Sequence, residues 1–188
     1  IQPIRGSVKV TGNTDTDVVF TDIESGEIVP ASACRCKKCY EKWKNKYYIL
    51  MNDICFDNVV QIGWLCLEYI FYKFESEPIL FVCVDEEKNI YLCLCSEFRH
   101  GKKWIVTKCS IITLKVLIEE EIDVASAFLT SSNIIAINMD MWGNESSCVI
   151  ENEKIDRLDL PKKGHILGVI KKRHEIICGT KSYPIVCN

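Results

Sequence analysis

The sequence lacks several features that would point directly to a membrane location or to a familiar activity. None of its apolar runs approaches the roughly 20 residues of a membrane-spanning helix, because Lys, Glu or Asp interrupts each one. It contains no P-loop, no glycine pattern of a dinucleotide site and no H-E-x-x-H zinc helix. Residues 1–6 also lack the apolar core of a signal peptide. We therefore expect no membrane partner and none of the common nucleotide-dependent or zincin-type enzymes.

Histidine is scarce, and this scarcity limits acid–base and nucleophilic chemistry. His100, His165 and His174 each stand beside Gly or a basic residue in an expected turn. A pairing of Cys95 or Cys178 with one of them stays open, because such a pair depends on geometry. Carboxylates cluster at adjacent positions, which is typical of solvated charge rather than of a catalytic pair. We predict no catalytic residues, and an enzyme of unrecognised type is kept only as a second alternative.

What the sequence does contain indicates a globular protein with a real core. Hydrophobic residues make up 48% of the 188 positions and charged residues 26%, which is the usual balance for a folded domain. This length suits one domain, or one domain with a small N-terminal module. Asn52 and Asp53 mark a plausible boundary. We predict a hairpin-and-helix module at residues 1–52 and a sheet domain at residues 53–188.

Cysteine is abundant, with twelve residues, and its positions bear on the compartment. Cys66, Cys83, Cys93 and Cys95 lie inside apolar runs. A reduced Cys there behaves as a small hydrophobe, and reduced Cys is among the most buried residue types. Disulfides are rare in the reducing cytosol. The pattern therefore predicts a cytoplasmic protein whose thiols mainly fill its interior.

The expected N-terminal module is a hairpin followed by a basic helix. Residues 17–22 and 27–29 are typical of strands, and Gly26 between them can supply the positive φ of a short loop. Helical spacing is expected over residues 37–50. An apolar stripe there carries Cys36, Tyr40, Trp43, Tyr47 and Leu50. The pattern predicts that the aromatic face packs inward while the lysines face outward.

The remaining chain predicts an α+β fold in which an antiparallel or mixed β-sheet carries a central helical segment packed on it. A hairpin is expected at residues 79–95, with its turn at residues 85–89. The helical segment starts with Ser110 as a cap and buries Ile111, Leu114, Leu117 and Ile118, and Asp123 caps a second short turn at residues 124–129. The other strands are expected at residues 59–74, 103–108, 134–139, 148–151, 166–170 and 175–178.

Three closely spaced cysteines form the best candidate for a metal site. Cys34, Cys36 and Cys39 have short spacings at which soft thiolates can converge on a tetrahedral Zn²⁺. A fourth ligand is needed, and Cys55 is the nearest candidate. The alternatives are incidental thiols, or a redox thiol activated by the neighbouring basic residues. The cofactor prediction is therefore none, or structural zinc.

The same stretch carries the strongest local charge of the chain. The whole sequence has a net charge of −3, but residues 34–48 contribute +5, which leaves −8 for the rest. Basic side chains interleaved with aromatic ones resemble a surface on which bases stack and phosphates pair, although a solvated lysine face is the commoner arrangement. The candidate surface for a protein partner or a nucleic acid comprises Arg35, Lys37, Lys38, Lys42, Lys44, Lys46 and Tyr48.

The core positions of residues 60–130 show a resemblance to a known group of domains. The apolar hairpin at 78–85 and 90–95, the Trp-bearing strand at 104–106 and the helical region ending in Ala127-Phe128 carry it. This pattern resembles a small bacterial family of uncharacterised domains of unknown function. The resemblance implies no catalytic residues, and the cysteine triplet lies outside it.

Together these patterns favour a non-enzymatic protein-interaction module of bacterial, phage or mobile-element origin. The reasons are a well-defined core and the lack of organised polar chemistry. The main alternative is a small zinc-stabilised nucleic-acid-binding protein that uses the triplet and the basic helix. The sequence does not predict an oligomeric state.

Overall fold

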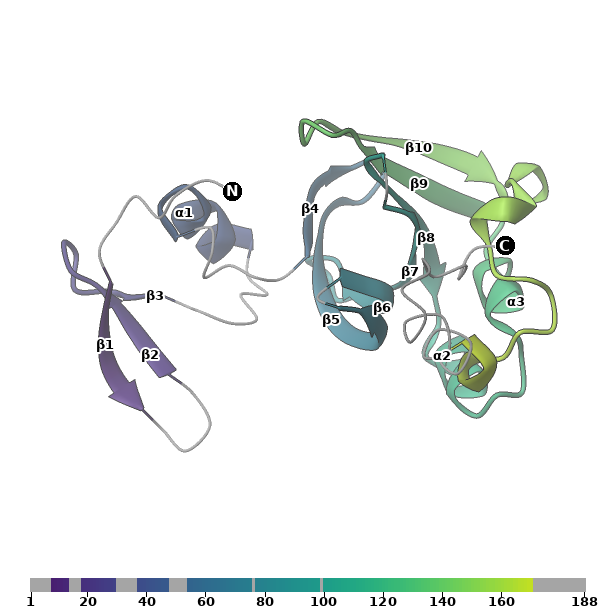
Figure 1. Ribbon diagram of the computed structural model, residues 1–188, viewed down its shortest axis with the longest axis horizontal. Helices are drawn as coiled ribbons and strands as arrows, with labels where there is room; N and C mark the ends of the chain where they lie inside the picture. The colour runs from purple at the N-terminus through teal and green to yellow at the C-terminus, as the bar shows by residue number, and fades with distance from the viewer. Residues whose placement is uncertain are drawn as a thin grey trace.

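The computed structural model describes residues 8–13, 18–29, 37–47, 54–75, 77–98 and 100–170. The first sheet has three antiparallel strands, β1 (Val8–Asn13), β2 (Val18–Asp22) and β3 (Ile28–Val29), and helix α1 (Lys37–Tyr47) follows it (Figure 1). The predicted hairpin and helix are both present, and Gly26 has a φ of +71°. Tyr40 and Trp43 are buried, as their helical spacing predicts. The boundary at residue 52 stays a prediction.

The second sheet has seven antiparallel strands whose spatial order equals their order in the chain. It curls until it is nearly closed, so that its first and last strands approach each other (Figure 1). The backbone N–H of Val60, in the turn after the first strand, donates to Oγ of Ser147 in the last strand at 2.8 Å. The strands are β4 (Cys55–Val59), β5 (Gly63–Phe74), β6 (Glu77–Val84), β7 (Ile90–Glu97), β8 (Lys102–Cys109), β9 (Asn133–Met139) and β10 (Glu145–Glu151).

The curled sheet has an inner and an outer face, and both faces of its central strands are buried. Paired residues in an antiparallel sheet point to the same side. Phe81, Cys93 and Val106 are register partners and share one face. Phe56 on β4 meets Trp104 on β8 edge to face, with ring centroids 5.0 Å apart, although these strands are not neighbours. This contact therefore crosses the inside of the curl.

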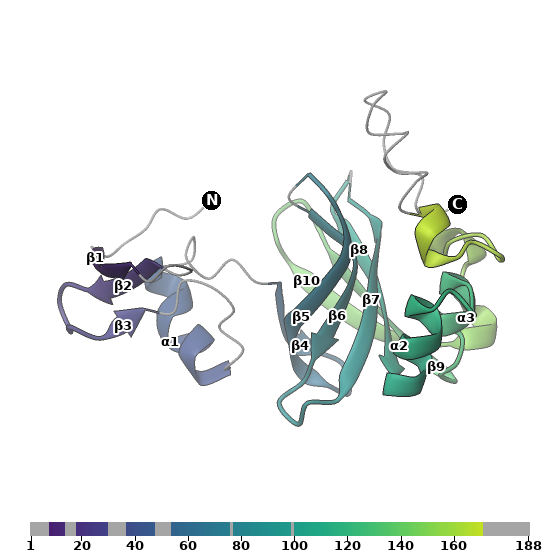
Figure 2. The same ribbon diagram turned by 90° about the horizontal axis from the view of Figure 1, so that it is seen from below.

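Two short helices, α2 (Ile111–Ile118) and α3 (Val124–Phe128), follow β8 and lie together beside the sheet (Figure 2). The predicted caps are confirmed: Ser110 Oγ accepts from the Thr113 N–H, and Asp123 Oδ1 accepts from the Ser126 N–H. Leu117 and Phe128 are fully buried in the same cluster as the strand residues. No helix of the described residues is long and apolar enough to cross a membrane.

The observed fold is mostly antiparallel sheet with a few short helices, which agrees with the α+β class only in outline. The position of a helical segment over the centre of the sheet stays a prediction. The expected strand at residues 59–74 is present as β5 from Gly63 to Phe74, but it starts later than predicted, because a turn at residues 60–62 separates Val59 from Gly63, whose φ is +86°. The pairing is antiparallel throughout the described sheets, so the mixed alternative is not realised there.

Two further details differ from the sequence prediction. Within α2, Leu117 is buried but Ile111 and Ile118 are exposed, so the predicted apolar face is only partly covered. Residues 166–170 do not form a strand. Residues 167–170 form a helical turn instead, and the Gly168 N–H donates to the Glu120 carboxylate at 2.8 Å. The expected strand at residues 175–178 lies outside the described residues.

The turn between β6 and β7 is built around Asp85. Its Oδ1 accepts from the N–H groups of Glu87 and Asn89, and its Oδ2 accepts from Asn89 Nδ2. The Lys88 N–H donates to the Asp85 carbonyl, and Lys88 has a φ of +68°. Tyr91 Oη also donates to Oδ2 at 3.2 Å. The turn is therefore held by one aspartate, one residue with positive φ and one asparagine.

The turn between β9 and β10 repeats this arrangement at Asp140. Its Oδ1 accepts from the N–H groups of Trp142 and Asn144, and its Oδ2 accepts from Asn144 Nδ2. The Gly143 N–H donates to the Asp140 carbonyl, and Gly143 takes the positive φ of +86°. The two hairpins thus share one five-residue turn, Asp-x-x-(positive φ)-Asn.

Candidate functional site

The lysines of the predicted basic surface are largely engaged within the chain. Lys46 forms ion pairs with the buried Asp22 at 2.8 Å and with Glu24, and Lys42 pairs with Glu27 at 2.6 Å. The hydrogen bonds to Asp22 and Glu24 raise the pKa of Lys46 above its ordinary value. These contacts tie α1 to the β2–β3 hairpin, so a structural role accounts for both lysines.

The other members of that surface are not brought together by the described structure. Lys37 lies 3.8 Å from Glu86 of the β6–β7 turn, and Lys38 is exposed. The position of Lys44 is described only for its backbone in α1. Arg35 and Tyr48 lie outside the described residues.

The predicted zinc ligands are only partly described. Cys39 is half-buried in the first turn of α1, and Cys55 is placed through its backbone at the start of β4. Cys34 and Cys36 lie outside the described residues. Among the residues that are described, no group of three or more His, Cys, Asp and Glu side chains could hold a metal ion. Structural zinc stays a prediction.

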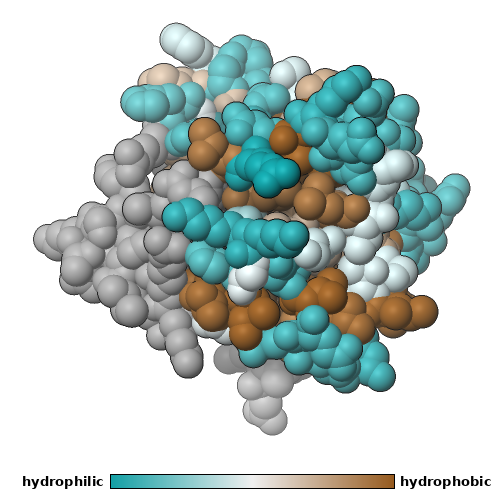
Figure 3. Space-filling view, turned by 90° about the vertical axis from the view of Figure 1, so that its right-hand side faces the viewer, coloured by the Kyte–Doolittle hydropathy of each residue, from teal (hydrophilic) through white to brown (hydrophobic). Residues whose placement is uncertain are grey.

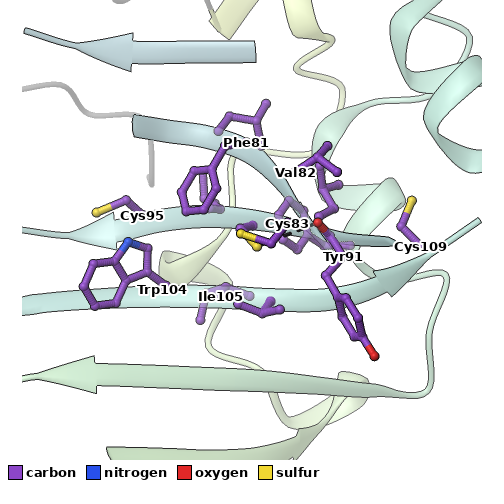
Figure 4. Packing of buried hydrophobic residues seen from close by; sticks show 14 of the residues in the cluster. Phe81, Val82, Cys83, Tyr91, Cys95, Trp104, Ile105 and Cys109 are labelled. Atoms are coloured by element: carbon purple, nitrogen blue, oxygen red, sulfur yellow. Dashed lines mark hydrogen bonds between the residues drawn. The ribbon is translucent and has the colours of Figure 1, made fainter. Parts of the chain in front are cut away.

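The buried thiols of the large sheet are poor nucleophiles. Burial raises the pKa of Cys95 to about 12 and that of Cys109 to about 11, so both stay protonated at neutral pH. Cys83, Cys95 and Cys109 stand among apolar and aromatic side chains (Figure 4). Cys178, the other candidate for a Cys/His pair, lies outside the described residues. The buried thiols of the large sheet therefore fill space in its apolar interior.

Alkylation should separate the buried and exposed thiols sharply. Cys148 is exposed on β10, whereas Cys95 is buried and protonated. We expect N-ethylmaleimide at pH 7.5 to modify Cys95 at least about a hundredfold more slowly than Cys148, because only an accessible thiolate reacts. Peptide mapping by mass spectrometry resolves the two sites. The rates should converge in denaturant, and equal rates in the native protein would contradict the assignment.

A groove of about 730 Å³ lies between α3 and the segment that follows β10. We call residues 152–165 of this segment the strap. The strap includes two short 3₁₀ helices, η2 (Asn152–Lys154) and η3 (Arg157–Asp159). Apolar side chains form the floor of the groove. The floor comprises Ala125, Leu129, Ile155, Leu160 and Pro161, and Leu158 lines its edge.

Hydrogen bonds fix the strap at both ends. At its start, Asn152 Nδ2 donates to the carbonyls of Leu129 and Ser131 at 3.3 and 3.0 Å. At its end, the Gly164 N–H donates to Asp123 Oδ2 at 2.6 Å, and the Val124 N–H donates to the His165 carbonyl. Burial acts to raise the pKa of Asp123, but its hydrogen bonds outweigh this and lower it, so the carboxylate is charged at neutral pH. One wall of the groove is therefore a segment that hydrogen bonds hold in place at both ends.

The middle of the strap is anchored on the sheet, and this anchoring turns two side chains outward. Asp159 pairs with Lys103 of β8 and accepts a hydrogen bond from Ser96 of β7. Arg157 and Leu158 precede it on η3 and are exposed, with Leu158 exposed by 66%. On this face of the molecule, apolar patches alternate with hydrophilic side chains (Figure 3). An exposed leucine beside an arginine is thus held in place at the edge of the groove.

The rim of the groove carries a net positive charge. Arg157, Lys162 and Lys163 line it, against one carboxylate, Glu153. Arg157 and Lys162 form no ion pair with another described residue, whereas the charge of Lys163 acts on Asp123 and helps to lower the pKa of that carboxyl group. An apolar floor with cations at its edge suits a ligand that carries both apolar groups and negative charge. Sequence reasoning missed this site, because Pro161-Lys162-Lys163-Gly164 indicates only a turn.

Comparisons with known proteins add no relative from which a role could be transferred. No family model, no curated protein and no solved structure matches this chain. The resemblance of residues 60–130 to the bacterial family therefore stays a prediction, and any function has to be argued from the geometry.

Proposed function

We propose that this protein is a non-enzymatic interaction module whose groove binds an acidic, partly apolar segment of a partner protein. The observation that carries the proposal is the combination of an apolar floor with three cations on the rim, two of which, Arg157 and Lys162, form no ion pair with another described residue. Charge on the rim steers and selects a partner, while buried apolar area supplies most of the affinity. The volume of about 730 Å³ lies within the roughly 300–1,000 Å³ of ordinary ligand sites.

The proposed compartment is the reducing cytosol. Seven cysteines of the described residues are present as thiols, and five of them are buried. Reduced thiols persist where glutathione and thioredoxin act. This supports a partner that is met inside a cell.

Binding of a designed peptide tests the groove. The probe is a fluorescein-labelled peptide in which Glu alternates with Leu and Trp. We expect saturable binding by fluorescence polarisation, weakened at least about tenfold by combining Arg157→Glu with Lys162→Glu, because reversed charge on the rim repels the carboxylates. Both side chains are exposed and unpaired, so the double variant should fold.

Three controls make the peptide experiment specific. The variant that combines Lys108→Glu with Lys115→Glu carries the same change of net charge, but both positions lie outside the groove and should leave affinity unchanged. A peptide with Lys in place of Glu, and one with Ser in place of Leu and Trp, should bind poorly. Equal binding of the acidic peptide to both double variants would overturn the proposal.

A further inference from the structure

The β9–β10 hairpin displays two large apolar side chains to solvent. Trp142 is 84% exposed and Met141 is 72% exposed, and together we call them the tip. The turn that carries them is held by the side chain of Asp140, which accepts three hydrogen bonds. Trp is strongly enriched among residues that dominate binding energies. An exposed tryptophan on a hydrogen-bonded turn is therefore a candidate binding residue.

The β6–β7 turn shows that folding does not require the tip. It has the same hydrogen bonds around Asp85, yet Glu86 and Glu87 occupy the positions of Met141 and Trp142. Both glutamates are exposed. One turn geometry thus accepts either charged or apolar residues at these two positions. The turn does not need Met141 and Trp142 in order to form, so these two side chains are free to serve in binding.

The surroundings of the tip are acidic. Asp140 and Glu145 flank it in the chain. Hydrogen bonds, first of all from Asn144, lower the pKa of Asp140 and keep it charged, whereas burial and the neighbouring Asp57 raise the pKa of Glu145. Lys102 and Lys103 line the adjacent hollow together with these acids, but they are ion-paired to Glu77 and Asp159. An apolar tip beside the charged Asp140, which forms no ion pair with a described residue, disfavours an anionic membrane surface and favours an apolar site with a basic rim.

The groove described above is such a site, but the tip cannot reach it within one molecule. The groove begins where β10 ends, at Asn152, whereas the tip lies at the other end of the same hairpin. Strands of seven residues separate the two by roughly 20 Å. Figure 1 shows the turn at one end of β9 and β10, and α3 with the strap at the other. The occupant must come from another molecule.

We propose that the protein self-associates by docking the Met141–Trp142 tip of one copy into the groove of a second copy. This inference rests on the proposed function, because it names the segment that the groove takes. In this complex the apolar side chains of the tip contact the apolar floor of the groove, and the carboxyl groups of Asp140 and Glu145 lie against the cations of the rim. The two surfaces are different patches, so each copy carries one of each.

Complementation of two defective variants tests this contact. Sedimentation equilibrium should show concentration-dependent association of the wild-type chain, weakened at least about thirtyfold by Trp142→Ser or by Leu158→Glu. Mixing these two variants should restore a complex, because one supplies the groove and the other supplies the tip. Glu87→Ser changes the matching position of the sister turn and should leave association unchanged.

The possible outcomes separate this inference from the proposed function. If the acidic peptide binds the groove but the wild-type chain stays monomeric at every concentration, self-association is wrong and the proposed function stands. If the peptide does not bind, both fail. If the mixture of the two variants remains monomeric although the wild type associates, a different surface is responsible and the tip–groove contact is refuted.

Discussion

Replacing Trp104 by Ala should lower the free energy of unfolding by about 4 kcal/mol, the usual range for a buried Trp. Its ring fills the inside of the curled sheet against Phe56, and the two strands involved are not neighbours. Removing it leaves a cavity that close-packed strands cannot collapse to fill. Because whole domains are stable by only about 5–15 kcal/mol, this is a large fraction. Urea unfolding followed by circular dichroism measures the change.

Trp104→Phe provides the matched control. The indole N–H of Trp104 is buried and has no hydrogen-bond partner among the described residues. A buried donor without a partner costs free energy, so a Phe that lacks this donor recovers part of the loss. We expect a destabilisation below about 2 kcal/mol. A double-mutant cycle with Phe56→Ala should give a coupling of about 0.5–1.5 kcal/mol. A destabilisation by Trp104→Ala within 1 kcal/mol of zero would contradict the crossing contact.

Replacing Asp85 by Ala should lower the free energy of unfolding by about 3 kcal/mol. The carboxylate is nearly buried and accepts hydrogen bonds from Glu87, Asn89 and Tyr91, so its loss leaves several donors without a partner. Urea unfolding at pH 7 gives the difference. Asp140→Ala is the natural control, since the same turn stands there in solvent and water can replace the carboxylate. Its cost should stay near 1 kcal/mol.

The pH dependence gives a second measure of Asp85. Burial alone would raise its pKa, but the hydrogen bonds from Asn89, Tyr91 and Glu87 outweigh burial and lower it. A carboxyl group whose pKa is lower in the folded state stabilises the protein above its unfolded pKa, and this contribution is lost as the pH falls. The wild-type chain should therefore lose stability between about pH 5 and pH 3 more steeply than Asp85→Asn. Parallel curves would show that the carboxylate charge has no such role.

The central hairpin of the large sheet and the N-caps of α2 and α3 could be predicted because the local sequence determines them. Continuous apolar runs on either side of residues 85–89 indicate a central hairpin, and Ser110 and Asp123 have side chains that satisfy the first N–H groups of a helix. The turn at residues 60–62 was missed because apolar residues on both sides mask it, and only Gly63 marks the bend. The uncovered faces of Ile111 and Ile118 could not be foreseen, since periodicity does not show what packs against a helix.

The groove could not be predicted, because its parts come from separate stretches of the chain. The floor needs α3, which follows β8, and the strap, which follows β10. The bonds that join them, such as that from Gly164 to Asp123, link residues 41 positions apart. The turn that carries the tip could be predicted from the sequence. Asp140 and Asn144 have the same spacing as Asp85 and Asn89, and Trp142 lies between them. Repeated turn chemistry in one sequence is a usable signal.

The order of the strands has a consequence for how the chain folds. Every strand of the large sheet pairs with its neighbours in sequence, so each pairing except β8–β9, whose strands are separated by α2 and α3, closes only a short stretch of chain. The bond from Val60 to Ser147 is different, because it spans 87 residues. Forming this contact early would cost much loop-closure entropy, and the cost becomes small only once the intervening strands have paired. We therefore expect the contact between the β4–β5 turn and β10 to form last, and to open first under mechanical or thermal load.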